Sequence, residues 1–230
     1  MSQRNEMHRY DKRTLSFYAT LIVIVLGSVV PVAQAQPSKD VITVGTVLAT
    51  ATTVDVPVYI RDVSGSPLGL DQPAGSRIQS YSIKVNYAPA SAVQSVTFSR
   101  AGITTALTPT LEVSPSSTGA ISLLDTFDES TDLIPFVLNG ATPGNQVGHL
   151  VFTLTPGTPS GTIISLTLDP TLTLLTDQGG DAATKENTSS ANLTLVNGSI
   201  SFVDSVPALS TYMLLLLAAS LAVAGLRIRL

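Results

Sequence analysis

The sequence has no cysteine, no tryptophan and only two histidines. Without cysteine, a disulfide framework is excluded. His8 lies near the amino terminus, so the main part of the chain has one histidine, His149. One histidine and no cysteine also exclude a zinc site made from the usual nitrogen and sulfur ligands. Any fold must therefore be stabilised by apolar burial, which is sufficient for a domain of ordinary size.

The shortage of histidine also bears on catalysis. A Ser-His-Asp arrangement needs a histidine that accepts the proton of the nucleophile. Residues 147–155 alternate, with Leu150, Phe152 and Leu154 on one side and His149 on the other. This pattern predicts a strand whose outer face carries His149. We therefore expect a surface histidine and a protein that is not an enzyme.

The absence of tryptophan bears on sugar binding, because flat aromatic rings stack on the C–H groups of sugar rings. The alternation predicts that Tyr81 and Tyr87 point inward, which leaves Tyr59 pointing outward. This argues against a strong polysaccharide-binding face. A carbohydrate-binding module stays an alternative, with Tyr59 as its aromatic contact.

The amino-terminal end has the three parts of a secretory signal peptide. Residues 1–14 carry four basic side chains, residues 15–32 are mostly apolar, and Ala33-Gln34-Ala35 is a small-x-small site. The sequence predicts a signal helix in residues 1–35, with cleavage between Ala35 and Gln36. An uncleaved membrane anchor is the alternative.

The carboxy-terminal end is a second apolar segment. Residues 209–226 are interrupted by few polar side chains, and Arg227 and Arg229 follow. Eighteen helical residues reach about 27 Å, close to the thickness of a bilayer core. Arginines retained on the cytoplasmic side fit the positive-inside rule. Residues 206–230 are therefore predicted to contact the membrane through a transmembrane helix.

Removal of both ends leaves one domain, residues 36–205. It contains fourteen acidic and six basic residues, a net charge of −8. Such a charge repels nucleic acid, so no nucleic-acid partner is expected.

The domain is rich in short alternating segments. In residues 80–87, apolar side chains at 81, 83, 85 and 87 alternate with polar ones, and Ala88-Pro89 ends the segment. Similar β-type segments are 41–44, 53–60, 90–98, 120–127, 147–155, 162–168, 171–175 and 193–202, and residues 133–138 repeat the apolar pattern. About nine strands with frequent turn signals predict an all-β antiparallel sandwich.

Three places break the regular pattern. Pro57 lies within a strand, which predicts an edge strand or a bulge. Asn197-Gly198 separates two runs of opposite parity, which predicts a bulge. Residues 177–190 are polar and loop-like.

Acidic residues gather after residue 124. Oxygen-rich clusters suit calcium, and paired acids can also cleave glycosidic bonds. A solvated acidic loop is the simplest interpretation, and calcium is the main alternative. The cluster consists of Asp125, Asp128, Glu129 and Asp132, and a looser group with the same alternatives consists of Asp177, Asp181 and Glu186.

Five segments, taken in order, resemble the cohesin domain of bacterial scaffoldins. They are residues 53–58, 82–89 with 93–96, 119–125, 148–154 and 195–202. The sequence departs from the family at Ala88, where an acidic residue is usual before the proline, and in the long loop 64–76.

The cohesin resemblance implies a nine-stranded jelly roll that acts as a non-catalytic interaction module. Its implied partner is a calcium-loaded dockerin-type protein, in a setting associated with polysaccharide breakdown. We expect the contact to involve Lys84 and Asn86 together with Asp125, Asp128 and Glu129. A structural matrix or adhesin protein is a further alternative.

The carboxy terminus resembles the short protein-sorting tails of Gram-negative bacteria that begin Ile-Pro-Thr-Leu. The matching features are Val206-Pro207, the apolar run, and Arg227 and Arg229. This resemblance implies an exported protein of the cell envelope, anchored in the membrane and then cut near Val206-Pro207. Anchoring without cleavage is the alternative.

Overall fold

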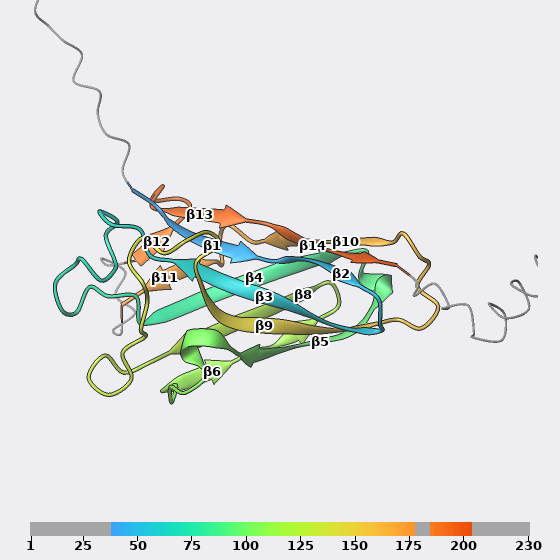
Figure 1. Cartoon of the computed structure of the whole chain (residues 1–230), viewed down its shortest axis with the longest axis horizontal. Helices are drawn as coiled ribbons and strands as arrows, with labels where there is room; N and C mark the ends of the chain where they lie inside the picture. Colours follow the sequence, from blue (N-terminus) through green and yellow to red (C-terminus); the bar gives the residue numbers. More distant parts are fainter. Residues whose placement is uncertain (1–37, 178–184, 204–230) are drawn as a thin grey trace, which may run out of the picture. The chain divides into compact units, whose positions relative to one another are not determined.

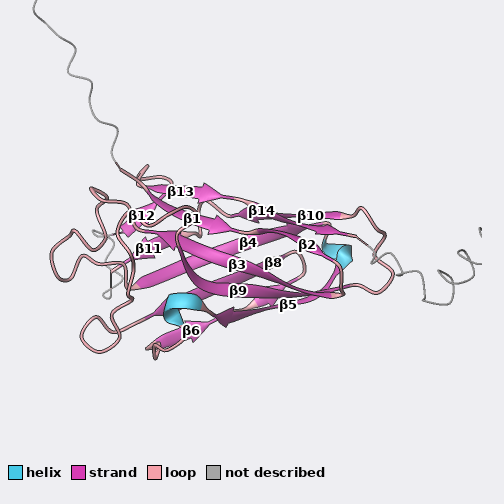
Figure 2. Cartoon of the chain, in the orientation of Figure 1, coloured by secondary structure: helices cyan, strands magenta, loops and turns pink. Residues whose placement is uncertain are grey.

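The computed structural model describes residues 38–177 and 185–203 of the chain. These residues form two β-sheets, one of five strands and one of nine (Figures 1 and 2). The all-β prediction is thus confirmed. The helical elements within these residues are two short 3-10 turns, η1 (Ala90–Ala92) and η2 (Gly102–Thr104).

Both predicted end segments lie outside the described residues. This applies to the signal cleavage site at Ala33, Ala35 and Gln36, and to the sorting tail with Val206, Pro207, Arg227 and Arg229. Within residues 38–177 and 185–203, no helix has the length and apolar composition needed to cross a membrane.

The five-stranded sheet contains β9 (Asn145–Leu154), the longest strand of the described part of the chain. In spatial order its strands are β13 (Leu193–Val196), β1 (Asp40–Val44), β3 (Thr53–Arg61), β9 and β5 (Val93–Arg100). All pairs are antiparallel except β1 with β13, which is parallel.

The nine-stranded sheet is built around β4 (Ser80–Ala88). One edge of β4 pairs with two strands. Its last residues pair with β10 (Ile163–Leu168), which is followed by β14 (Gly198–Phe202) and β2 (Thr46–Ala49). Its first residues pair with β11 (Leu174–Thr176), which is followed by β12 (Lys185–Asn187). On the other side lies β8 (Ala120–Thr126), which pairs with β6 (Leu111–Val113) and β7 (Ser116–Ser117).

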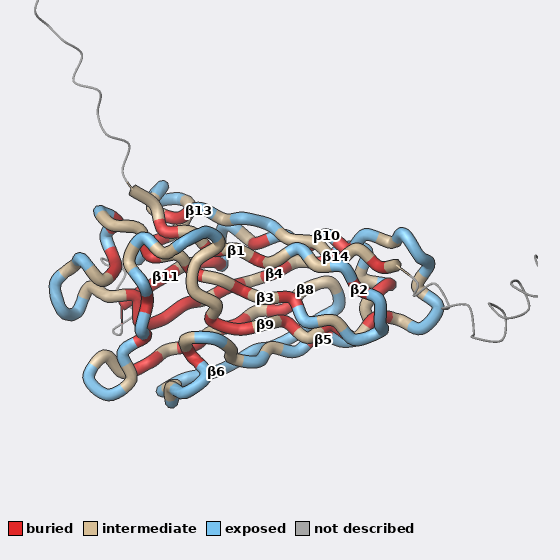
Figure 3. The backbone as a smooth tube through the Cα atoms, in the orientation of Figure 1, coloured by how far each residue is buried: buried red, intermediate tan, exposed pale blue. Residues whose placement is uncertain are grey.

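The core lies between the sheets and follows the alternation of the sequence (Figure 3). Tyr81, Ile83 and Val85 of β4 have no exposed surface, and Phe152 of β9 faces them as part of the same cluster. The Tyr87 ring meets the Phe152 ring edge-on, with centroids 5.6 Å apart. The inward prediction for both tyrosines is confirmed.

The prediction that Pro57 marks an edge strand is wrong, whereas the bulge is present. β3 lies inside its sheet between β1 and β9, and its register with β9 shifts at Val58/Tyr59. Proline is tolerated here because the pairing of β1 ends at Val44. Beyond that point the Gly45 amide donates a hydrogen bond to the Pro57 carbonyl at 2.8 Å.

Asn197 marks a change of sheet rather than a bulge. β13 belongs to the five-stranded sheet and β14 to the nine-stranded one, and Asn197 alone separates them. β1 and β2 change sheets in the same way at Gly45. Because β13 runs parallel to β1 and β14 parallel to β2, the two strands cross side by side. The sandwich is therefore not wholly antiparallel, and residues 38–177 and 185–203 form fourteen strands rather than about nine.

Two other segments differ from expectation. Residues 177–190 are not all loop, since β12 pairs with β11 and buries Glu186 completely. Residues 133–138 form no strand, although Ile134 and Phe136 are buried in the core.

Substitution of Gly198 by alanine is expected to destabilise the sandwich. A Cβ atom there would lie 2.1 Å from the Gly45 carbonyl oxygen and 2.6 Å from that of Val44. Overpacking of this kind costs about 1–3 kcal/mol of unfolding free energy, measurable by urea denaturation. Ser199→Ala is the control, because Ser199 is only half-buried. Equal stability of the two variants would contradict a close crossing.

Candidate partner-binding face

The outer face of the nine-stranded sheet carries the polar side of β4. Ser82, Lys84 and Asn86 alternate with buried residues, so their side chains stand on the outside and are half-buried. Lys84 lies opposite Ser122 of β8, and Asn86 lies between β8 and β10. The predicted contact residues Lys84 and Asn86 therefore share one face.

Lys84 is fixed by the segment that connects β10 to β11. Its Nζ lies 3.6 Å from Oδ2 of Asp169, and the Asp169 amide donates to the Lys84 carbonyl at 2.9 Å. The pKa of Asp169 is lowered first by the amide of Thr171 and further by the charge of Lys84. The face thus presents a cation whose partner is itself accessible to solvent.

A row of side chains that is apolar except for Ser82, called the apolar row below, crosses the same face beside Lys84. Val113 of β6 lies opposite Leu124 of β8, Leu124 lies opposite Ser82 of β4, and Ser82 lies opposite Leu174 of β11. Val113 is 44% exposed, and Leu172, next to the row, is 49% exposed. The alternation of β8 already places Leu124 on the outside, although this residue was not among those predicted for contact.

Asp125 lies in the core, which corrects the expectation that it shares a surface loop with the other acidic residues. It is 1% exposed, and Tyr81 Oη donates to its Oδ2 at 2.5 Å. Burial raises the pKa of Asp125 to about 6, although the Tyr81 hydrogen bond lowers it. The signal was its parity, which it shares with the inward-facing Ile121 and Leu123.

The remaining acidic residues bind donors near their own loop. Asp128 Oδ1 accepts from the Ser130 amide at 2.7 Å, and Glu129 Oε1 accepts from the Gly75 amide at 2.9 Å. Asp132 Oδ1 accepts from the Thr108 amide at 3.1 Å. Among the described residues, no group of three or more His, Cys, Asp or Glu is arranged to hold a metal ion. Calcium binding by this loop stays an alternative to the solvated acidic loop.

The structure does not bring this loop together with Lys84. The loop follows the end of β8, which lies opposite Ser80 at the start of β4. Lys84 is four strand positions further along, about 13 Å away at the usual rise. Lys84 and Asn86 belong to the middle of the face, whereas Asp128 and Glu129 lie beyond its end.

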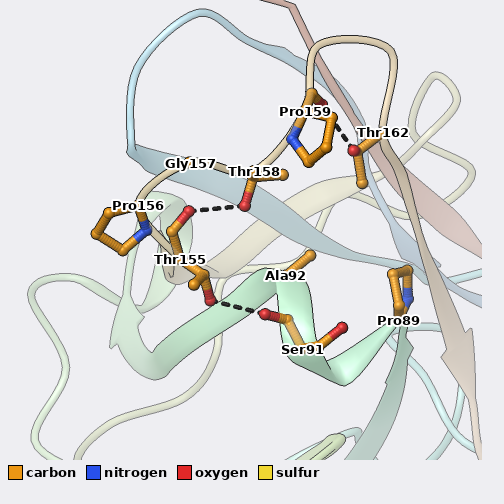
Figure 4. A pocket seen from close by; sticks show the side chains of 9 residues that line it. All are labelled: Pro89, Ser91, Ala92, Thr155, Pro156, Gly157, Thr158, Pro159 and Thr162. Atoms are coloured by element: carbon orange, nitrogen blue, oxygen red, sulfur yellow. Dashed lines mark hydrogen bonds between the residues drawn. The ribbon is translucent and has the colours of Figure 1, made fainter.

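A hollow of about 260 Å³ opens next to η1 (Figure 4). Its threonine hydroxyls donate to nearby carbonyls, from Thr155 to Ser91, from Thr158 to Thr155 and from Thr162 to Pro159. It is lined by Pro89, Ser91, Ala92, Thr155, Pro156, Gly157, Thr158, Pro159 and Thr162, none of which is ionisable. This lining offers no acid or base for catalysis. His149 lies elsewhere, opposite Pro57 and Ser99, and is half-buried.

Solved structures that resemble this chain include several cohesin domains. One is the cohesin CaCohA2 from Clostridium acetobutylicum, with 20% identity, a TM-score of 0.49, and 75% of this chain and 96% of that chain covered. Another is the sixth cohesin of scaffoldin B from Acetivibrio cellulolyticus, in complex with a Cel5 dockerin, with 14% identity, a TM-score of 0.48, and 72% and 99% covered.

A third is a non-cellulosomal cohesin from the archaeon Archaeoglobus fulgidus, with 15% identity, a TM-score of 0.46, and 73% and 93% covered. No protein-family model matches the sequence, and no curated protein does.

Tyr81→Phe is expected to lower the free energy of unfolding by about 1–3 kcal/mol, because it leaves a buried carboxylate oxygen without its donor. The other oxygen of Asp125 already has no hydrogen-bond partner. The loss should be larger at pH 7 than at pH 4, where a carboxyl with a raised pKa is protonated. Tyr59→Phe, at a half-buried tyrosine, is the control, and urea denaturation at both pH values is the measurement. An equal loss in both variants would contradict the role of the Tyr81 hydroxyl.

Proposed function

We propose that this chain is a non-catalytic, cohesin-like interaction module that binds a dockerin-type protein through the outer face of the nine-stranded sheet. The half-exposed apolar row next to Lys84 and Asn86 carries the proposal. An apolar stripe flanked by polar and charged side chains is what an amphipathic helix of a partner can cover. A dockerin-type partner presents paired helices, which this row suits.

The segments that resemble cohesins support the same reading, because each coincides with strands of the sandwich. Residues 53–58 lie in β3, 119–125 mainly in β8, and 148–154 in β9. Residues 82–89 include most of β4, and 195–202 span the change from β13 to β14. The segments that resemble cohesins are therefore strands of this sandwich, and they follow one another in the order expected for that family.

The cellular location of the module is inferred from the two terminal segments of the sequence. We infer an exported protein of a Gram-negative cell envelope, held at the membrane by residues 206–230 or released after cleavage near Val206-Pro207. A link to polysaccharide breakdown follows from the resemblance and belongs to the same proposal.

Residues 36–205, used as bait on secreted and envelope proteins of the host, test the function. We expect retention of a partner in calcium and its loss in EDTA, since the implied dockerin is itself calcium-loaded. The sequence of that partner should contain paired helices with calcium-binding loops. Absence of any retained protein in both conditions would contradict the proposal.

Leu124→Asp tests the face. A charge in the middle of the apolar row is expected to weaken binding of the captured partner by tenfold or more, since central apolar contacts often contribute above about 1.4 kcal/mol. Val151→Asp is the matched control, because Val151 is also half-buried but lies on the five-stranded sheet. Calorimetric titration measures both affinities. Equal loss of affinity in both variants would contradict the outer face of the nine-stranded sheet as the contact surface.

A carbohydrate-binding module is the second candidate, and one hollow favours it. Tyr59 and Pro57 line a depression of about 300 Å³ on the five-stranded sheet, together with Pro143 and Val196. A half-buried tyrosine in an apolar hollow can stack on a sugar ring.

Tyr59→Ala is expected to abolish retention on insoluble glycans if this candidate is correct, whereas Tyr59→Phe keeps the ring and should keep binding. A pull-down assay on cellulose, chitin and xylan measures both variants. If wild-type protein is not retained on any of them, the second candidate is contradicted.

A further inference from the structure

Three carboxyl groups are completely buried at one end of the sandwich. Asp40 is the first residue of β1, Asp62 follows the last residue of β3, and Glu186 is the middle residue of β12. All three have an exposed fraction of 0%. The start of β1 and β12 lie at the left end in Figure 1. Buried carboxyl groups are costly unless they are paired or neutralised, so this group calls for an explanation.

One oxygen of each group binds the backbone of a single loop. The Val63 amide donates to Asp40 Oδ1 at 2.7 Å, and the Leu70 amide donates to Asp62 Oδ2 at 2.9 Å. The amide of Leu68, which is itself fully buried, donates to Glu186 Oε1 at 3.0 Å. Asp40 and Glu186 from distant segments, together with Asp62 at the start of the loop, thus hold residues 63–70 in place.

The second oxygen of each group has no donor. Asp40 Oδ2, Asp62 Oδ1 and Glu186 Oε2 are buried without a hydrogen-bond partner. The side chains of Asp40 and Glu186 nevertheless lie within hydrogen-bonding reach of each other. Because an ionised carboxylate only accepts, these two side chains can form a hydrogen bond with each other only when one of them carries a proton.

The charged surroundings of the cluster are acidic. Asp62 faces Asp40 and Glu186, and Asp71 on the loop faces Asp62. The ion pairs Lys84–Asp169 and Arg100–Glu112 lie elsewhere in the sandwich. Burial is the main cause that raises the pKa of Asp40 to about 7 and that of Glu186 to about 9, and the charge of Asp40 adds to the latter.

We propose that Asp40, Asp62 and Glu186 form a proton-dependent clasp, in which a proton shared by Asp40 and Glu186 holds the 63–70 loop against β1 and β12. Loss of that proton places like charges side by side in the core and releases this end of the sandwich. The clasp lies apart from the proposed docking face and does not depend on it.

The sign of the pH dependence follows from proton binding. In the unfolded chain these carboxyl groups titrate near 3.8 and 4.5, far below their values in the fold. The folded state therefore holds more protons between about pH 4 and pH 9, so the free energy of unfolding falls as the pH rises through that range. The stabilisation is complete below about pH 4.

Urea denaturation of the full chain at pH 5, 7 and 9 tests the clasp. The midpoint of the wild-type protein should fall with rising pH. In Glu186→Gln the amide oxygen still accepts from Leu68 and the NH₂ group donates to Asp40, so the midpoint should be higher at pH 9 and vary less with pH. In Asp40→Asn the NH₂ group lies on residue 40 and donates to Glu186, so the midpoint should again be higher at pH 9 and vary less with pH. Asp55→Asn, at an exposed aspartate, removes one charge and is the control.

Direct titration keeps the proposal testable if a variant fails to fold. Carboxyl carbon NMR of the wild-type protein should show Glu186, Asp40 or both titrating above pH 6. Titration of both groups below pH 5 would overturn the clasp.

Urea denaturation with added calcium distinguishes a shared proton from a metal ion bound between Asp40 and Glu186. Added calcium should leave the wild-type midpoint unchanged at pH 9. A rise in that midpoint that is absent from Glu186→Gln would overturn the proton in favour of a bound cation.

Discussion

The sandwich depends on two strands crossing from one sheet to the other at a single point. β1 passes into β2 at Gly45, β13 passes into β14 at Asn197, and the two backbones touch where Gly198 meets the Gly45 carbonyl. No side chain fits between them. The Asn197 side chain accepts from the Leu168 amide at 2.9 Å, which satisfies a donor that the change of sheet would leave free. This crossing joins the edges of both sheets and fixes their mutual register.

The crossing lies away from β4, so it does not cover the outer face of the nine-stranded sheet along that strand. Most outward side chains of β8 and β10, the neighbours of β4, are small or polar. The apolar exceptions on this face include Leu124 of β8 and Val113 of β6, next to Lys84, and Ile163 of β10, which is 60% exposed. Lys84, held by Asp169, places a positive charge on the face of a domain, residues 36–205, whose net charge is −8. A docking surface of this type obtains affinity from the apolar row and orientation from the charge.

The buried carboxyl groups show how a sandwich without disulfides holds its long loops. Asp125 anchors Tyr81 inside the core, while Asp40 and Glu186 bind the backbone of the 63–70 loop. Such groups fix one arrangement of the chain, because each must find a donor when buried. Burial raises the pKa of Asp125, Asp40 and Glu186, so we expect the stability of the fold to depend on pH.

The sequence alone determined the class of fold, the inward faces of β4 and β9, and the outward positions of Lys84 and Asn86, because alternation with period two is a local property of a strand. The same parity already placed Asp40 with Ile42, and Asp125 with Ile121, on inward faces. Composition nevertheless suggested acidic surface loops.

Only the tertiary structure decided that the strands change sheets at Gly45 and Asn197, that Pro57 lies inside a sheet, and that Glu186 meets Asp40. These facts depend on which strands become neighbours, and residues far apart in the sequence carry no local signal of their pairing.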